Sequence, residues 1–509
     1  MMYLINLIFI VIVVVASNNC LGIPLDDYVN TPDPMFSWKR LQTYPLPTHT
    51  LYVLNMTSQK WFDESFSSHP IWWHYLTITV PRIVRRYKTA FLLITHGDNT
   101  DAMPTTNPMT NLALSTDSVT ATIHQIPNQP FRFWDDPFNK PRDEDALIAW
   151  TWKKFFDING TDPKVLLRFP MTKAVVRAMD TIEQFLKQQN LIVPEEFVIG
   201  GASKRGWTSK YIYTHTNFPS ILLRILAWTT AAVDNTRVVA AVPIVMDLLN
   251  IRPSMMSHYR SLGGWTFAFN DYYEMNITRY MNSSIFDKLG EMVDPYSFLN
   301  RYSKTKIFQL QGAGDEFFLP DSENFFWNDL QLATGGSHLR RIPNTGHSIR
   351  GYEESLTSFY LSVADRISLP SMKWTRTMNG THGIIHAIID FSAGRPKPTD
   401  VAAYQARTTD TLRRDFRQAK LDGTTGNIVA NPVIWANTAV QFESQMGSTA
   451  SYTLTVPIPT DGHWIAALIQ ATFPGREGTT LTLTTETIIL PNTYPLKECH
   501  DQECYGELV

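Results

Sequence analysis

The chain has 509 residues, 44% of them apolar, and its 44 lysines and arginines against 47 aspartates and glutamates leave a formal charge of −3. A nearly neutral chain without long charged runs excludes nucleic-acid binding driven by electrostatics. The length exceeds one typical domain and the apolar fraction is ample for a large core, so two folded domains are expected.

An apolar run from Leu4 to Val15, interrupted only by Asn6, opens the chain. The run is shorter than the ~20 residues that span a bilayer. Small and polar residues follow it up to Gly22, which is typical of a signal peptide over residues 1–22; the alternative is an uncleaved anchor. We expect a secreted, extracellular protein without stable membrane insertion.

Residues 23–370 alternate between predicted strands and helices. Apolar runs predict strands at 73–80, 91–95, 120–126, 197–199, 238–244 and 307–311. Helical spacing predicts helices at 145–156, after an N-cap at Thr172, and at 353–364. Nearly continuous apolar strands between helices indicate a mostly parallel sheet that is covered on both faces.

Two long segments, residues 100–142 and 251–300, interrupt this alternation and are expected to form cap insertions at the catalytic edge. The second is rich in aromatic residues. Its rings either line a substrate cleft, with Trp265 as a candidate substrate contact, or form the core of a cap.

The octapeptide Gly201 to Thr208 follows the strand at 197–199 and precedes a helix-compatible segment. A strand, a sharp turn and a helix hold a serine hydroxyl clear of the sheet, so Ser203 is the candidate nucleophile. A standard nucleophile elbow has glycine two residues after the serine, whereas this chain has Arg205 there. The alternative is a glycine-rich turn with an idle serine.

The two partners that such a serine needs lie downstream. Asp315 follows the predicted strand at 307–311, and His347 lies in a turn-rich loop before the last helix. Serine, acid, histidine is the chain order of an α/β-hydrolase triad. In that triad, the histidine accepts the serine proton and the acid orients the imidazole. Glu316 and Asp321 are rival acids.

The oxyanion is expected to be stabilised by backbone N–H groups. One is that of Lys204, and the other comes from Gly97 or Asp98 in the loop after the strand at 91–95. Arg205 permits an anionic substrate, although a buried structural ion pair explains it equally. No cofactor is required.

Residues 371–490 change character, because short, threonine-rich, often alternating strands at 383–389, 451–456, 464–469 and 480–485 are separated by turns. This pattern predicts a β-sandwich-like domain. It could pack on the hydrolase sheet, bind a carbohydrate or receptor, or form a wall of the active site.

A polar tail, residues 491–509, holds Cys499 and Cys504. Removal of the signal would also remove Cys20, and the remaining even pair fits a disulfide loop in an oxidising compartment. A metal site is the alternative, but it lacks a fourth ligand even with His500. Glycosylation sequons lie at Asn55, Asn159, Asn276, Asn282 and Asn379.

Several strings resemble those of the PhoPQ-activated pathogenicity-related proteins, whose eukaryotic relatives include the autocrine proliferation repressors. They are Gly201 to Thr208, GAGDEFFLPDS from Gly312, PNTGHS from Pro343, and shorter strings such as Leu25 to Val29 and Arg414 to Arg417. The resemblance implies an α/β-hydrolase-like domain with a triad at Ser203, Asp315 and His347. The family often has paired glycines where this chain has His96 and Gly97.

Two classes of function follow. The first is a secreted serine hydrolase that acts on an ester or amide of a small molecule, glycan or peptide. The second, implied by the resemblance, is a secreted signalling protein that represses proliferation by binding a cell-surface receptor. Fold alone does not decide between them.

Overall fold

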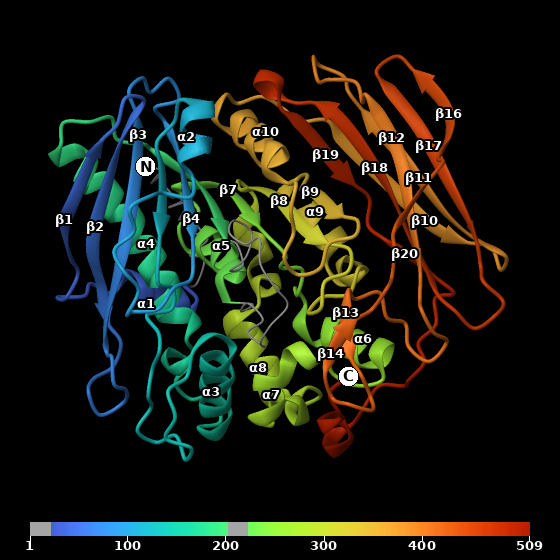
Figure 1. Ribbon diagram of the computed structural model, residues 1–509, viewed down its shortest axis with the longest axis horizontal. Helices are drawn as coiled ribbons and strands as arrows, with labels where there is room; N and C mark the ends of the chain where they lie inside the picture. The colour runs from blue at the N-terminus through green and yellow to red at the C-terminus, as the bar shows by residue number, and fades with distance from the viewer. Residues whose placement is uncertain (1–21, 202–221) are drawn as a thin grey trace, which may run out of the picture.

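The computed structural model describes residues 22–201 and 222–509. Over those residues, its central sheet has nine strands in the order β1-β2-β3-β5-β4-β6-β7-β8-β9 (Figure 1). Their bounds are β1 (Ser37–Pro45), β2 (His49–Lys60), β3 (Ile71–Pro81), β4 (Thr89–Ile94), β5 (Thr120–Ile123), β6 (Glu196–Gly201), β7 (Val238–Pro243), β8 (Lys306–Gly312) and β9 (His338–Ile342).

Strand direction divides this sheet. The pairs β1–β2, β2–β3 and β3–β5 are antiparallel, whereas all pairs from β5 to β9 are parallel. In β4, Ala90 and Leu92 enter the core on one face, and Phe91 and Leu93 enter the core on the other. Burial on both faces explains why a central parallel strand such as β4 is a nearly continuous apolar run in the sequence.

The strand order reverses between β4 and β6, because β5 lies on one side of β4 while β6 to β9 continue on the other. In open parallel sheets, such a reversal leaves a crevice at the carboxyl ends of the strands, where catalytic groups gather. Ile94 pairs with Gly201 at these two strand ends. The arrangement confirms the predicted α/β-hydrolase-like fold.

Helices cover both faces of the sheet. The buried residues of α4 and α5 join the core on one face, and those of α2 and α10 join the core on the other. α3 packs against α7 and α8 of the insertion at 251–300 (Figure 1). The helices are α1 (Pro24–Asn30), α2 (Thr110–Thr116), α3 (Glu144–Asp157), α4 (Arg168–Gln188), α5 (Leu222–Val233), α6 (Ile251–Leu262), α7 (Asn270–Glu274), α8 (Ser284–Val293), α9 (Trp327–Thr334) and α10 (Glu353–Ala364). Short 3₁₀ turns are η1 (Pro163–Val165), η2 (Phe267–Phe269), η3 (Ile277–Tyr280), η4 (Pro295–Tyr302), η5 (Ser322–Phe325), η6 (Arg476–Gly478) and η7 (Asp501–Tyr505).

The expected N-cap at Thr172 is wrong. α4 begins four residues earlier, at Arg168, and Pro170 is accommodated in its first turn. The Thr172 hydroxyl lies inside the helix, buried, 2.8 Å from the hydroxyl of Thr229 on α5. The Thr172 hydroxyl therefore bonds to a neighbouring helix and does not cap the start of α4.

The C-terminal third contains two facing antiparallel sheets. One has the order β10-β11-β17-β16, and the other has β15-β12-β18-β19 with β20 also paired to β18. Side chains from both sheets, including Ile385, Leu454 and Ile469, share one core cluster, as expected of a β-sandwich. The strands are β10 (Ser371–Met378), β11 (His382–Asp390), β12 (Asp400–Arg407), β15 (Ala436–Thr438), β16 (Gln441–Met446), β17 (Thr449–Pro457), β18 (Ile465–Pro474), β19 (Thr480–Thr484) and β20 (Ile488–Leu490), and a separate hairpin pairs β13 (Ala419–Leu421) with β14 (Ile428–Ala430).

The sandwich packs on the hydrolase-like part. Phe473, Leu481 and Leu483 join the core of the sheet face that α10 covers. The domain division near residue 370 stays a prediction, because this core crosses it.

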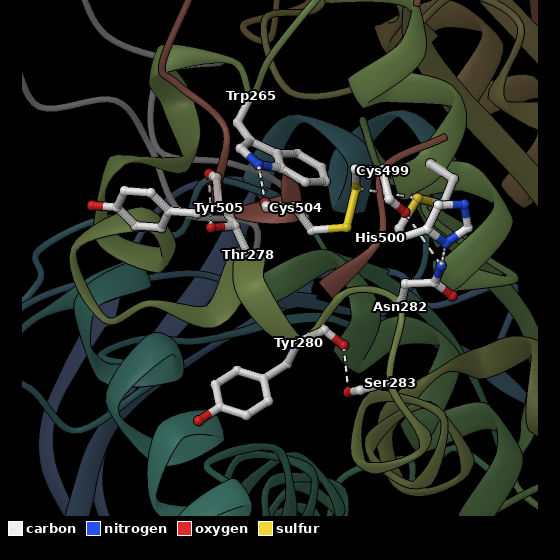
Figure 2. The surroundings of a disulfide bond; sticks show 10 residues. Trp265, Thr278, Tyr280, Asn282, Ser283, Cys499, His500, Cys504 and Tyr505 are labelled. Carbon is white, nitrogen blue, oxygen red and sulfur yellow. Dashed lines mark hydrogen bonds between the residues drawn. A yellow bond between two sulfur atoms is a disulfide. The ribbon is translucent and has the colours of Figure 1, made fainter. Parts of the chain in front are cut away.

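The segment 491–509 lies against the insertion at 251–300. Cys499 and Cys504 form a disulfide, and the Trp265 indole N–H donates to the Cys504 carbonyl oxygen at 2.9 Å (Figure 2). Both cysteines are buried. The structure thus contains the predicted disulfide, and the segment that holds it packs against the insertion at 251–300.

The disulfide is expected to add only modestly to stability, because a bridge between residues five apart constrains few residues of the unfolded chain. The loop-entropy relation gives about 2 kcal/mol. Denaturant unfolding of a Cys499→Ser/Cys504→Ser variant beside the wild type measures the difference. Alkylation in denaturant without reductant should leave both cysteines unmodified, and two alkylated cysteines would contradict the bridge.

Candidate active site

Two of the three predicted triad residues follow neighbouring strands. Asp315 lies just beyond β8, and His347 lies just beyond β9. The parallel pairing of these strands brings the two loops together at the carboxyl edge. Ser203, Lys204 and Arg205 lie outside the described residues, which stop at the end of β6 and resume at α5.

The Asp315 carboxylate contacts the His347 ring. Nδ1 of His347 donates to Oδ1 of Asp315 at 2.7 Å, and each residue is only 2% exposed. The same carboxylate oxygen accepts the backbone N–H groups of Phe317 at 2.7 Å and Phe318 at 3.2 Å. The backbone of this turn therefore fixes the Asp315 carboxylate, and the carboxylate orients the His347 ring with Nδ1 as the donor. Nε2 is then the nitrogen for proton transfer.

The rival acids have other partners. Oδ2 of Asp321 accepts from the Arg414 guanidinium at 2.6 Å, and both side chains are buried. Glu316 accepts the backbone N–H of His347 at 2.8 Å rather than a ring nitrogen. Of the three acids, Asp315 alone reaches the imidazole.

The predicted oxyanion loop follows β4, but one of its two donors is occupied. The Asp98 N–H donates to Asp101 Oδ2 at 2.8 Å, so the expectation for Asp98 is wrong. Within the described residues, no acceptor takes the Gly97 N–H. A Cβ at Gly97, whose φ is +150°, would lie 2.8 Å from the same Asp101 oxygen, so this position requires glycine.

Trp265 is a packing residue, which corrects its assignment as a substrate contact. It has no exposed surface, and its ring packs against Tyr259 while its N–H is used by the C-terminal segment. Instead, Phe269 and Tyr272 from the same insertion line a small cavity whose walls are mostly apolar but also include Arg168 and Asp294. The ring of Phe269 lies 5.9 Å from that of Phe317, which lies 4.3 Å from the His347 ring.

A buried ion cluster beneath the site was not predicted from the sequence. Arg341 on β9 donates to the Gly312 carbonyl oxygen at 2.8 Å and to Asp247 Oδ2 at 2.6 Å, and it also pairs with Glu323. All three charged side chains are fully buried. Burial raises the pKa of Asp247, although the neighbouring arginine opposes this effect. The cluster ties the ends of β7, β8 and β9 together beside Asp315.

The predicted sequons differ in their surroundings. Asn159 and Asn379 are exposed, whereas Asn55 and Asn276 are half-buried. The Asn282 side-chain amide donates to the Cys499 carbonyl oxygen at 3.3 Å (Figure 2). Asn159 and Asn379 are therefore the most accessible of the five.

In the part of the chain that the structure describes, no group of three or more histidine, cysteine or acidic side chains is arranged to hold a metal ion. No helix within residues 22–201 and 222–509 has the length and apolar character to cross a membrane.

The fold and the buried Asp315–His347 pair define an α/β-hydrolase-like protein. The chain belongs to the PhoPQ-activated pathogenicity-related protein family, whose model matches residues 25–217 and 225–417. It is 35% identical to autocrine proliferation repressor protein A of Dictyostelium discoideum over 98% of this chain and 97% of that relative.

Two solved structures are similar at a lower level. Acetyl xylan esterase 1 from Thermoanaerobacterium sp. JW/SL YS485 is 15% identical, with a TM-score of 0.42 over 67% of this chain and 93% of its own. An acetyl xylan esterase from Paenibacillus sp. R4 is 13% identical, with a TM-score of 0.43 over 66% and 91%. These similarities are weak, so the fold assignment rests on the strand order and strand directions of the central sheet.

Proposed function

We propose that the chain is a secreted serine hydrolase that transfers the acyl group of an ester or amide to water. The observation that carries the proposal is the buried hydrogen bond between the Asp315 carboxylate and Nδ1 of His347. A buried carboxylate stabilises the imidazolium that forms during general-base catalysis. The Asp315–His347 pair would activate a nearby nucleophile, for which Ser203 is the candidate.

In this mechanism, Ser203 Oγ attacks the carbonyl carbon while His347 Nε2 takes the hydroxyl proton. The oxyanion accepts hydrogen bonds from the backbone N–H groups of Lys204 and Gly97. His347 returns the proton to the leaving group, and the acyl-enzyme forms. Water then attacks the acyl-enzyme by the same proton route, which releases the acid and restores Ser203. Every step uses groups of this chain and needs no cofactor.

Secretion forms part of the proposal. The apolar run near the N-terminus, the Cys499–Cys504 disulfide and the exposed sequons at Asn159 and Asn379 support an oxidising, extracellular setting. The substrate is proposed to be a small molecule, glycan or peptide.

The alternative is a secreted signal that represses proliferation by binding a cell-surface receptor through this scaffold. It is favoured by the identity of 35%, over nearly the whole chain, to a protein named as an autocrine proliferation repressor. In that case the outer surface, rather than the Asp315 and His347 loops, would carry the activity.

The purified protein is expected to hydrolyse an activated short-chain ester and to lose this activity irreversibly with an organophosphonate. A panel of p-nitrophenyl esters and peptide anilides, assayed before and after treatment, provides the test. Absence of turnover on every substrate, together with no organophosphonate adduct by mass spectrometry, would contradict the hydrolase proposal and favour the signalling alternative.

A further inference from the structure

A second buried carboxyl group holds the histidine of the candidate site. Oε2 of Glu316 accepts the backbone N–H of His347 at 2.8 Å, and Glu316 is 7% exposed. The adjacent Asp315 binds the ring of the same histidine at Nδ1. Two successive acids on the loop after β8 therefore fix the backbone and the side chain of one residue.

The histidine loop is pressed against the acid loop, with little room to move. The Gly314 N–H donates to the Thr345 carbonyl oxygen at 2.9 Å. A Cβ at Gly346 would lie 2.5 Å from Glu316 Oε1, and a Cβ at Gly312 would overlap the Gly346 carbonyl oxygen. The Glu316 carboxyl thus occupies the space where a larger residue before His347 would place its side chain.

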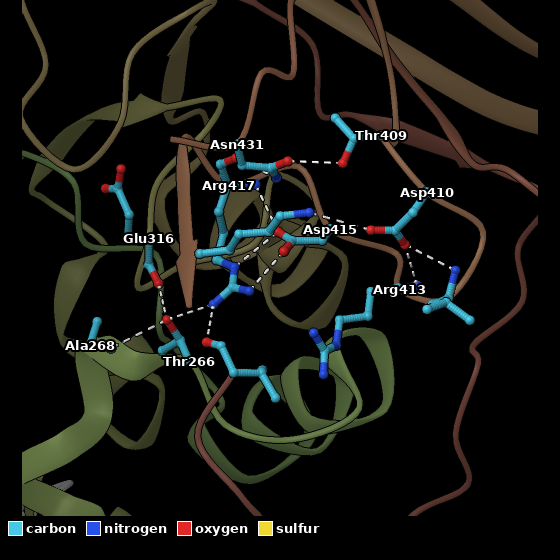
Figure 3. Close-up of polar contacts among 12 residues, drawn as sticks. Thr266, Ala268, Glu316, Thr409, Asp410, Arg413, Asp415, Arg417 and Asn431 are labelled. Atoms are coloured by element: carbon cyan, nitrogen blue, oxygen red, sulfur yellow. Dashed lines mark hydrogen bonds and ion pairs between the residues drawn. The ribbon is translucent and has the colours of Figure 1, made fainter. Parts of the chain in front are cut away.

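Glu316 is itself anchored from a distant part of the chain. The Thr266 hydroxyl donates to its carbonyl oxygen at 2.7 Å, and Arg417 Nη1 donates to the same hydroxyl at 3.0 Å (Figure 3). Asp415 in turn holds the Arg417 guanidinium, with Nε to Oδ1 at 2.9 Å and Nη2 to Oδ2 at 2.7 Å. The insertion and the segment before β13 therefore both fix the position of Glu316.

The charged groups that face Glu316 come from three segments. Asp315 lies on its own loop, His347 lies on the loop after β9, and Arg417 lies on the segment before β13. Burial, and then the charge of Asp315, raise the pKa of Glu316 to about 7, although the His347 N–H and Arg417 oppose the shift. The carboxyl group that accepts the His347 backbone N–H therefore changes charge near neutral pH.

We propose that Glu316 is a positioning residue, which fixes the backbone of His347 so that the imidazole stays bound to Asp315 and aimed at the substrate. The proposal rests on the proposed hydrolase function for its consequence in turnover. The geometric part of the proposal is that Glu316 keeps the His347 ring bound to Asp315. It depends only on the hydrogen bond between Glu316 and the His347 N–H, and it can be tested separately.

Two substitutions separate the possible roles of this side chain. Glu316→Gln keeps an acceptor oxygen for the His347 N–H but removes the charge, whereas Glu316→Leu removes the acceptor at similar size. For Glu316→Leu we expect kcat on an activated ester to fall by about 10²-fold, the typical cost of a misplacement near 1 Å, with KM unchanged. Glu316→Gln should retain most of kcat above neutral pH.

The pH profile tests whether the acceptor oxygen or the charge of Glu316 acts on His347. Protonated Glu316 keeps a carbonyl oxygen for the His347 N–H, as the amide of Glu316→Gln does, so the acid limb of kcat/KM should have the same slope in the two proteins. Because ionising a buried carboxyl opposes folding above its unfolded-state pKa, Glu316→Gln should unfold at no lower temperature than the wild type at pH 8. A steeper acid limb in the wild type than in Glu316→Gln would show that the charge of Glu316 acts rather than its acceptor oxygen, and would overturn the proposal.

A spectroscopic measurement distinguishes failure of this inference from failure of the hydrolase proposal. The low-field proton resonance of the His347 Nδ1–H, assigned by its loss in Asp315→Asn, should persist in Glu316→Gln and disappear in Glu316→Leu. If it does so in a protein without turnover, the positioning role holds and the hydrolase proposal fails. An unchanged resonance and unchanged kcat in folded Glu316→Leu would overturn the positioning role.

Discussion

The Ser203→Ala protein is expected to fold and be secreted but to lose ester turnover by about 10⁶-fold in kcat, the cost of removing the serine nucleophile from subtilisin. The reason is chemical: without the hydroxyl, no acyl-enzyme can form and His347 has no proton to accept. Turnover of an activated ester is measured beside Ser303→Ala, which changes an exposed serine before β8. Equal turnover by wild type and Ser203→Ala would remove Ser203 from the mechanism.

The same variant separates the two classes of function. If hydrolysis underlies the biological effect, Ser203→Ala should have no effect on growing cells at concentrations where the wild type acts. A receptor-binding protein should keep its effect, because its contacts would lie on the outer surface. A Ser203→Ala protein that slows proliferation as the wild type does would make signalling the leading explanation.

Asp315→Asn is expected to lower kcat by about 10⁴-fold, the cost measured for the equivalent change in a chymotrypsin-type triad. An amide in place of the carboxylate can donate to Nδ1, which favours the imidazole tautomer that cannot accept the serine proton. Asp321→Asn is the matched control. It should leave kcat nearly unchanged and lower stability, because Asp321 pairs with the buried Arg414.

The comparison of these two variants decides which acid serves the site. A severe loss of kcat in Asp321→Asn and a mild one in Asp315→Asn would contradict the assignment. Thermal unfolding of both proteins keeps an effect on folding apart from an effect on turnover.

Much of the hydrolase-like sheet could be predicted from local sequence. β4, which is buried on both faces, is almost entirely apolar, and α10 begins and ends where its spacing places it. β1 was missed, because an edge strand whose side chains are largely exposed carries no such apolar signal. β2 and β9 were missed although they are largely buried, because polar or charged residues interrupt their apolar runs. The start of α4 was misplaced because the Thr172 hydroxyl has its partner on another helix.

The site was predictable only in part. Proximity to the end of a strand favoured Asp315, but the ion pair that occupies Asp321 joins residues 93 apart and leaves no local trace. The sequence alone could have indicated that the Asp98 N–H has a partner, because Asp101 lies near enough along the chain to accept it. The sequence left Trp265 open between a cleft residue and a cap core residue, because its partner Cys504 lies at the far end of the chain.

The most direct test of the central claim is to locate a covalent label. Wild-type protein is treated with a fluorophosphonate and digested, and the modified peptide is sequenced by mass spectrometry beside Ser203→Ala and His347→Ala. The account predicts one adduct on Ser203, none in Ser203→Ala, and much slower labelling in His347→Ala. Absence of an adduct on Ser203 in active wild-type protein, or labelling of another serine at equal rate in all three proteins, would contradict it.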